Sequence, residues 1–151
     1  MRHLLISDTQ VKKGVPLDHI RALGNFIVDK KPERIIMIGD WADMPSLSSY
    51  DKPGTKAFEG RRYRDDIESS IEAMELLFQP INQYNNMRKR NKKKAYQPDL
   101  HLTLGNHENR IDRAVNLDPR LDGTLSVDDL QFESFGWKVY PFLHIVDLDG
   151  V

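Results

Sequence analysis

Short apolar segments alternate with helix-length segments along this chain of 151 residues. Three apolar segments, at 2–7, 34–38 and 99–104, are too short and too uniformly apolar for amphipathic helices, so they predict buried strands. Apolar residues at helical spacing separate them, over 17–30 and from about Tyr63 onward. Strands that alternate with helices form βαβ units. We therefore expect an α/β fold in which a mainly parallel or mixed sheet is flanked by helices.

The pattern is less regular after the third strand. Four further elements are expected there: helices over 106–116 and 127–134, and strands over 137–140 and 142–148. Ser126 is well placed as the N-cap of the second of these helices. A long helix is expected before the third strand, and Pro80 is expected to kink or end it.

The composition places limits on the class of protein. Apolar residues make up 39% and charged residues 30% of the chain, and the length predicts a single domain over 1–151. The net charge of −1 argues against a globally basic nucleic-acid binder, and the absence of Cys excludes disulfides and thiolate metal sites. No apolar run is long enough to span a membrane, and no signal peptide follows Met1. These features predict a cytoplasmic protein.

The C-terminal end has the pattern of an interrupted hairpin. Asp149-Gly150 is a hairpin turn signal, and only Val151 follows it. A domain of this kind would leave a strand without its partner. We expect that the chain is the front part of a longer protein and that its domain is incomplete at the C-terminus.

Polar residues follow each of the three predicted strands where the strand ends. They are Asp8-Thr9-Gln10, Gly39-Asp40 and Gly105-Asn106-His107-Glu108. Ligands bind outside the carboxyl ends of the strands in open α/β sheets. Three strand ends that carry oxygen and nitrogen donors therefore predict a metal site at this edge.

Each of these residues also has an ordinary structural interpretation. Asp8 and Asp40 could cap helices or form turns, and Gln10 could be a polar loop residue. Asn106 could adopt a left-handed turn conformation, and His107 could face solvent at a helix start. Caps and turns do not explain a Gly-Asn-His-Glu sequence after a strand, which favours the metal site.

Taken in order, the three motifs resemble the Asp-x-His, Gly-Asp and Gly-Asn-His-(Asp/Glu) signature of the calcineurin-like metallophosphoesterases. The resemblance covers residues 1 to about 116. It implies a metallophosphoesterase-like two-sheet sandwich, of which this chain builds the front portion. It also implies metal-dependent hydrolysis of a phosphodiester or phosphomonoester by a hydroxide that bridges two divalent cations.

The resemblance assigns metal-binding roles to single residues. Asp8 would hold the first metal, Asp40 would bridge both, and Asn106 would hold the second. Gln10 stands where the family has His, and an amide oxygen favours Mn²⁺ or Mg²⁺ over Zn²⁺. We expect Mn²⁺, with Mg²⁺, Fe or Zn²⁺ as alternatives. The family's downstream His ligands are absent, because only His144 follows, so the second metal site is expected to be incomplete.

The same loop would supply the groups that act on the substrate. His107 would protonate the leaving oxygen or stabilise charge on the phosphoryl group. Glu108 would hydrogen-bond the His107 ring and orient it. Arg110 is close enough in sequence to meet a phosphate, and Asp43 could support the site or be an ordinary loop carboxylate.

The sequence leaves four classes of substrate open: a nucleic acid, a nucleotide, another small molecule and a phosphoprotein. The Gly-Asp motif lacks the Asp-Arg-Gly continuation of the protein phosphatases, because it continues as Trp41-Ala42-Asp43-Met44. Arg61, Arg62 and Arg64 could line the substrate entrance.

A dense basic segment supports an alternative function. Six of the seven residues over 88–94 are Lys or Arg, and Tyr84 and Tyr96 flank them and could stack on bases. The alternative is a non-catalytic phosphoesterase-like module that binds nucleic acid through this segment. A solvated helix end is the ordinary interpretation of the same residues.

Overall fold

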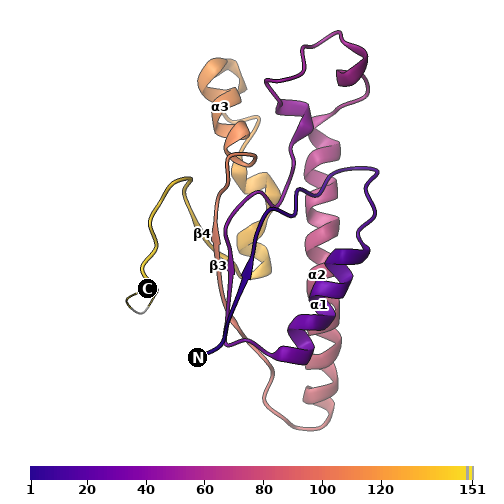
Figure 1. Ribbon diagram of the computed structural model, residues 1–151, viewed down its shortest axis with the longest axis vertical. Coiled ribbons are helices and arrows are strands. Elements are labelled where there is room, and N and C mark those ends of the chain that lie inside the picture. Colours follow the sequence, from indigo (N-terminus) through magenta and orange to yellow (C-terminus); the bar gives the residue numbers. More distant parts are fainter. Residues whose placement is uncertain (149, 151) are drawn as a thin grey trace.

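The computed structural model describes residues 1–148 and 150, and its fold is α/β (Figure 1). The four strands are β1 (His3–Ile6), β2 (Arg34–Met37), β3 (Asp99–Thr103) and β4 (Lys138–Tyr140). They lie side by side in chain order, and every neighbouring pair is parallel. The register aligns Leu4 with Ile35 and Ile35 with Leu100. The predicted parallel sheet is confirmed.

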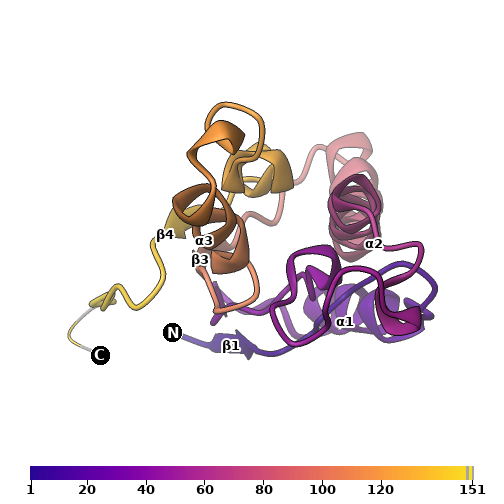
Figure 2. The same ribbon diagram turned by 90° about the horizontal axis from the view of Figure 1, so that it is seen from above.

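Two long helices cover one face of the sheet. The α-helices are α1 (Asp18–Lys30), α2 (Tyr63–Arg90) and α3 (Asn109–Leu117). Short 3₁₀ turns complete the fold: η1 (Pro45–Leu47), η2 (Lys56–Phe58), η3 (Pro119–Leu121), η4 (Val127–Leu130) and η5 (Phe132–Phe135). Seen from above, α1 and α2 lie together on one side of the sheet (Figure 2). The fully buried side chains of Ile20, Ile27, Leu77 and Ile35 belong to the core between these helices and the sheet.

The sequence predicts a kink or a helix end at Pro80. The helix end is wrong, because α2 continues through this residue to Arg90, and the kink stays a prediction. Packing against α1 explains why the helix continues. A Cβ atom on Gly24 of α1 would lie 2.5 Å from the carbonyl oxygen of Leu77 and 3.1 Å from the Pro80 ring. The two helices therefore touch where Pro80 lies, and burial there offsets the hydrogen bond that proline cannot donate.

The elements after β3 differ in detail from their prediction. The expected helix over 127–134 is instead η4 and η5, because Gln131 between them adopts the left-handed conformation with φ 56°. Ser126 is confirmed as the N-cap, since its hydroxyl accepts from the Asp128 amide at 3.1 Å in a complete capping box.

The strand expected over 142–148 is wrong. Pro141 directly follows β4, and Leu143 has a φ of 64°, which an extended strand does not allow. His144 instead donates its amide to the Pro141 carbonyl at 3.1 Å in a turn. The apolar alternation of 142–148 is therefore not accompanied by a β-strand. Within residues 1–148 and 150, no helix has the length and hydropathy needed to cross a bilayer.

The second face of the sheet is only partly covered. Residues 141–148, which follow β4, run along this side, away from α1 and α2 (Figures 1 and 2). Val146 and Leu148 line a cavity of about 220 Å³ together with strand residues such as Ile36 and His101. Leu5 and Ile38 nevertheless stay 60% and 49% exposed. Parallel sheets are normally buried on both faces, so this face has room for a further layer.

The amino-terminal end of β3 carries a charge network that predicts a pH-dependent stability. Lys138 at 2.6 Å and His101 at 2.7 Å, together with Arg34 at 3.2 Å, hold the pKa of the Asp99 carboxyl well below its usual range. This carboxylate stabilises the fold above the unfolded pKa of about 3.9, and the contribution is lost as the pH falls toward the lowered pKa.

We expect Asp99→Asn to flatten the fall in unfolding free energy between about pH 4 and pH 2, measured by urea denaturation. Asp112→Asn is the control, because Asp112 is exposed on α3. Equal pH slopes in the two variants would contradict this account of Asp99.

Candidate metal and phosphoester site

The loops after β1 and β2 are joined along the carboxyl edge of the sheet. The Gln10 amide donates to the Asp40 carbonyl at 2.9 Å, and the Val11 amide donates to the Trp41 carbonyl at 2.7 Å. The Asp43 amide returns a hydrogen bond to the Val11 carbonyl at 3.0 Å. Parallel pairing thus continues beyond the strands, which holds the loop that bears Asp8 and Gln10 beside the loop that bears Asp40.

Trp41 anchors this pair of loops to α2. Its side chain is fully buried, and its indole Nε1 donates to the Ser70 carbonyl at 3.2 Å. Ala42 and Met44 are also fully buried. The residues that follow Asp40 are therefore part of the core, so the Asp40 carboxylate stands on a fixed backbone.

Asp8, Gln10 and Asp40 all have a left-handed backbone, with φ of 53°, 45° and 52°. Asp tolerates this region better than most residues, whereas Gln does not. The strained backbone turns these three side chains toward the edge of the sheet. The Gln10 amide nitrogen donates to Asp8 Oδ1 at 2.6 Å, so coordination of a metal by the Gln10 oxygen requires the amide to rotate.

Glu108 connects the loop after β3 to the loop after β2. Its fully buried carboxylate accepts from the amides of Asp40 at 3.0 Å, Ala42 at 2.9 Å and Gly105 at 2.9 Å. Burial raises the pKa of Glu108, and the three backbone donors oppose that rise. The expectation that Glu108 orients the His107 ring is wrong, because both carboxylate oxygens point into the backbone of the loops.

The two glycines of the motifs allow the loops to touch. A Cβ atom on Gly39 would lie 2.5 Å from the backbone of Gly105, and Gly39 also has a φ of 88°. A Cβ atom on Gly105 would lie 2.2 Å from Asp40 Oδ1 and 2.3 Å from the Asp40 amide. No other residue fits at either position without moving the Asp40 loop.

We expect Gly105→Ala to destabilise the fold by about 1–3 kcal/mol, because the added methyl group overlaps the Asp40 backbone and carboxylate. Urea denaturation measures this change. Gly123→Ala is the matched control, since a Cβ atom there meets nothing within 4 Å, although its φ of 75° adds some strain. A loss no larger at Gly105 than at Gly123 would contradict the close approach.

His107 is oriented by Asp43. Its Nδ1 lies 2.7 Å from the Asp43 carbonyl oxygen and 3.0 Å from Asp43 Oδ1, and its backbone amide donates to Asp40 Oδ1 at 3.0 Å. Lys12 forms an ion pair with the same carboxylate at 2.6 Å. From the sequence, Asp43 could either support the site or be an ordinary loop carboxylate. No sequence pattern pointed to Lys12.

Arg110 donates hydrogen bonds to the backbone of the loop that contains Asp43. It is buried, and its guanidinium donates to the carbonyls of Asp43 at 2.8 Å and Met44 at 3.3 Å. A second guanidinium nitrogen lies 3.4 Å from His107 Nε2. The guanidinium is therefore engaged by the chain itself, and its predicted contact with a phosphate stays a prediction.

A cavity of about 560 Å³ adjoins this group of residues. Asp43 and Arg110 form one wall, and Arg61 and Arg62 form part of another. Arg61 is held by an ion pair with Asp51 at 2.6 Å. Arg64 does not line the cavity, because its strongly exposed side chain pairs with Glu68 along α2. Two of the three arginines expected at the substrate entrance thus border this cavity.

The donor atoms at the edge are all oxygens. Asp8 and Asn106 are exposed, and Gln10 and Asp40 are half-buried. Two carboxylates and two amides fit hard cations such as Mn²⁺ and Mg²⁺, whereas Zn²⁺ prefers nitrogen and sulfur ligands. In the part of the chain that the structure describes, no three His, Asp or Glu side chains are grouped to hold a metal.

Comparison with known proteins gives two relatives. "Gene 54 protein" of Mycobacterium phage L5 is 29% identical over 148 residues, and "Gene 54 protein" of Mycobacterium phage D29 is 28% identical over 148 residues. Each match covers 93% of this chain and 51% of the phage protein, so the chain spans about half the length of these relatives. Neither name states an activity. No protein-family model and no solved structure matches the chain.

Proposed function

We propose that the chain carries the site of a metal-dependent phosphoester hydrolase of the metallophosphoesterase type. One observation carries this proposal: the polar ends of β1, β2 and β3 meet at one edge, where Asp40 contacts both other loops. The order of the motifs along the chain supports the same activity.

The residues at this edge fit a hard divalent cation, and Mn²⁺ is our first choice. Asp8, Asp40, Gln10 and Asn106 would hold it through oxygen atoms. When bound, divalent cations would neutralise charge on the phosphoryl group and activate the attacking water. The oxygen-only donor set is the reason for preferring Mn²⁺ or Mg²⁺ to Zn²⁺.

His107 acts on the leaving-group side in this proposal. Asp43 fixes the ring through Nδ1, so Nε2 is the atom left for the substrate. Nε2 would first have to give up its 3.4 Å contact with the Arg110 guanidinium. From there it would donate a proton to the leaving oxygen or stabilise charge on the phosphoryl group. The cavity beside Asp43 and Arg110 is large enough to take the group that leaves or remains attached to the phosphate.

The sandwich architecture is part of the same proposal. The exposed outer face of the sheet at Leu5 and Ile38 suits the second layer of a metallophosphoesterase-like sandwich. The relatives are about twice as long as the matched region. We propose that the whole protein supplies this second layer and the ligands that the second cation lacks.

The test is hydrolysis of bis-p-nitrophenyl phosphate and p-nitrophenyl phosphate by this chain with added Mn²⁺. We expect metal-dependent release of p-nitrophenolate that Asp40→Asn abolishes. Asp29→Asn is the control, because Asp29 is an exposed carboxylate of α1. The ratio of diester to monoester turnover would separate nuclease from phosphatase activity. Turnover that survives Asp40→Asn would contradict the proposal. Because the second cation lacks ligands in this chain, the absence of turnover favours a non-catalytic module if the whole protein is inactive as well.

A further inference from the structure

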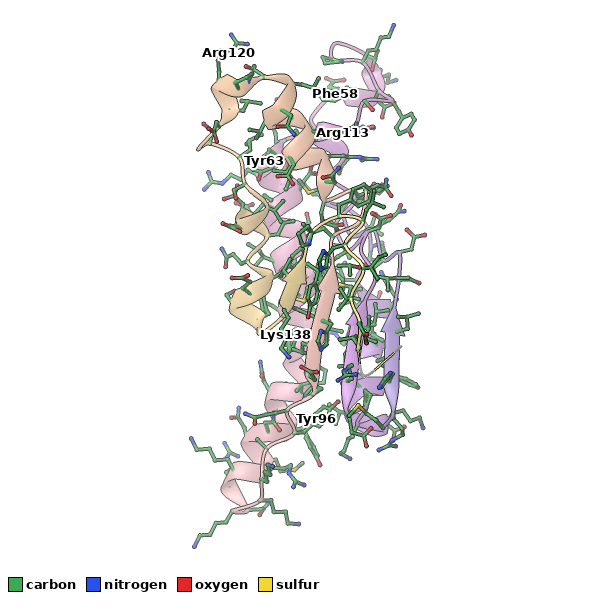
Figure 3. All side chains as sticks on the ribbon, turned by 90° about the vertical axis from the view of Figure 1, so that its left-hand side faces the viewer. Phe58, Tyr63, Tyr96, Arg113, Arg120 and Lys138 are labelled. Atoms are coloured by element: carbon green, nitrogen blue, oxygen red, sulfur yellow. The ribbon has the colours of Figure 1, made fainter. Side chains whose placement is uncertain are left out.

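The basic segment 88–94 lies at the end of the molecule opposite the candidate site. It contains the last turn of α2, whose 28 residues extend about 42 Å at about 1.5 Å each. Figure 1 shows α2 running from the loops at the carboxyl edge of the sheet to the far end of the fold. In Figure 3, Tyr96 lies in the half of the molecule that contains this end of α2, and Phe58 and Arg113 lie in the other half. A ligand on the basic segment would thus lie far from Asp40.

The charge of this segment is unbalanced. Its six Lys and Arg residues are accompanied by no Asp or Glu, so the rest of a chain of net charge −1 carries −7. Five of the six are exposed: Lys89, Arg90, Lys92, Lys93 and Lys94. Among the residues that the structure describes, none of these five forms an ion pair, whereas Lys12, Lys13 and Lys138 all do. The segment therefore presents five cations without a counter-charge from the protein.

The backbone that carries these cations is fixed in place. The Arg88 guanidinium donates to the Lys94 carbonyl and to the Tyr84 hydroxyl. Asn85 exchanges two hydrogen bonds with the backbone of Tyr96, at 2.8 Å and 2.7 Å. The Tyr96 hydroxyl donates to the Pro32 carbonyl at 2.7 Å. Both tyrosines are thus used to hold the loop, and a ligand would meet a preorganised row of charges.

The helix end is capped in an unusual way. Lys93 donates its amide to the Arg88 carbonyl at 2.9 Å and Lys92 to the Lys89 carbonyl at 3.0 Å, which is the Schellman pattern. Lys92 occupies its left-handed position with a φ of 53°, where Gly is the usual residue. Cations in the last turn are favoured by the helix dipole, but this effect does not account for three lysines beyond the helix end.

We propose that segment 88–94 is a docking surface for the phosphate backbone of a nucleic acid. Five free cations on a fixed loop match a regular row of phosphates. A segment that binds a membrane surface would carry Trp, Phe or Leu beside its cations, whereas the exposed apolar residues that flank this segment are Met87, at 53%, and the small Ala95. This surface uses none of the residues of the proposed hydrolase site, so it holds whether or not the chain hydrolyses phosphoesters.

The test is binding of a fluorescein-labelled 20-base-pair DNA duplex, followed by anisotropy in EDTA between 50 and 200 mM salt. EDTA keeps divalent cations from the proposed hydrolase site. If all five cations meet phosphates, the plot of log Kobs against log salt has a slope of about −4.5, or roughly a 500-fold loss over this range. Lys93→Gln/Lys94→Gln is expected to reduce the magnitude of the slope by about 1.8.

Two further variants make the result specific. Lys52→Gln/Lys56→Gln removes the same charge from exposed residues at the other end of the molecule, and it should leave the slope unchanged. Lys92→Gly should lower DNA affinity while keeping or raising the melting temperature, because Gly suits the left-handed position. Equal losses in the two double variants would overturn the proposal. So would binding to phosphatidylserine vesicles without binding to DNA, or the absence of salt-dependent DNA binding.

Discussion

Replacing Glu108 with Ala is expected to destabilise the fold by about 3–5 kcal/mol, because the backbone amides of Asp40, Ala42 and Gly105 would lose the carboxylate oxygens that accept from them. The carboxylate is fully buried, and its bonds to Ala42 and Gly105 are buried as well. Glu108→Gln keeps the shape but turns an amide nitrogen toward backbone donors, so we expect an intermediate loss. Urea denaturation of the three proteins gives the order.

Glu72→Ala is the matched control for Glu108. Glu72 is an exposed carboxylate on α2, and its removal should change the free energy of unfolding by less than about 0.5 kcal/mol. A Glu108→Ala variant as stable as this control would mean that the loops after β2 and β3 do not depend on the carboxylate. The edge of the sheet would then need another explanation.

The second large effect concerns turnover. Replacing His107 with Ala is expected to lower the rate about 10²–10⁴-fold on a dinucleotide, whose leaving group is a sugar alkoxide that needs a proton. The loss should be much smaller on bis-p-nitrophenyl phosphate, because p-nitrophenolate leaves without protonation. Steady-state rates on both substrates, with Mn²⁺ present, make the comparison.

The leaving-group dependence separates the two roles proposed for His107. A similar loss on both substrates would contradict proton donation and would assign His107 to charge stabilisation on the phosphoryl group. His19→Ala is the control, since His19 is an exposed histidine of α1. Asp43→Asn should also lower the rate on the dinucleotide, because Asp43 orients the His107 ring through Nδ1.

The sheet and the meeting of its polar strand ends followed from local patterns in the sequence. After Arg34, β2 is apolar and rich in Ile, which is typical of strands buried in a parallel sheet. Parallel pairing then fixes where the strand ends lie, and the residues after β1, β2 and β3 meet there as expected. Short-range information was sufficient for these features, because each strand and its polar end are contiguous.

The contacts within the site could not be predicted in the same way. Glu108 binds the Ala42 amide across 66 residues, and His107 meets Asp43 across 64. The side chains that pair across such distances depend on how two loops pack, which in turn depends on the burial of Trp41. For residues 142–148 the local pattern itself was misleading. Their apolar alternation is typical of a strand, but Pro141 and the left-handed backbone of Leu143 prevent one.

The central claim is that Asp8, Gln10, Asp40 and Asn106 hold a hard divalent cation, and Mn²⁺ binding tests it most directly. Titration of the chain with Mn²⁺, followed by electron paramagnetic resonance of the free ion, should show saturable binding. Asp40→Asn should weaken that binding roughly 10-fold or more, and Asp29→Asn should leave it unchanged. No saturable binding, or equal binding by the wild-type chain and Asp40→Asn, would contradict the metal site on which the proposed function depends.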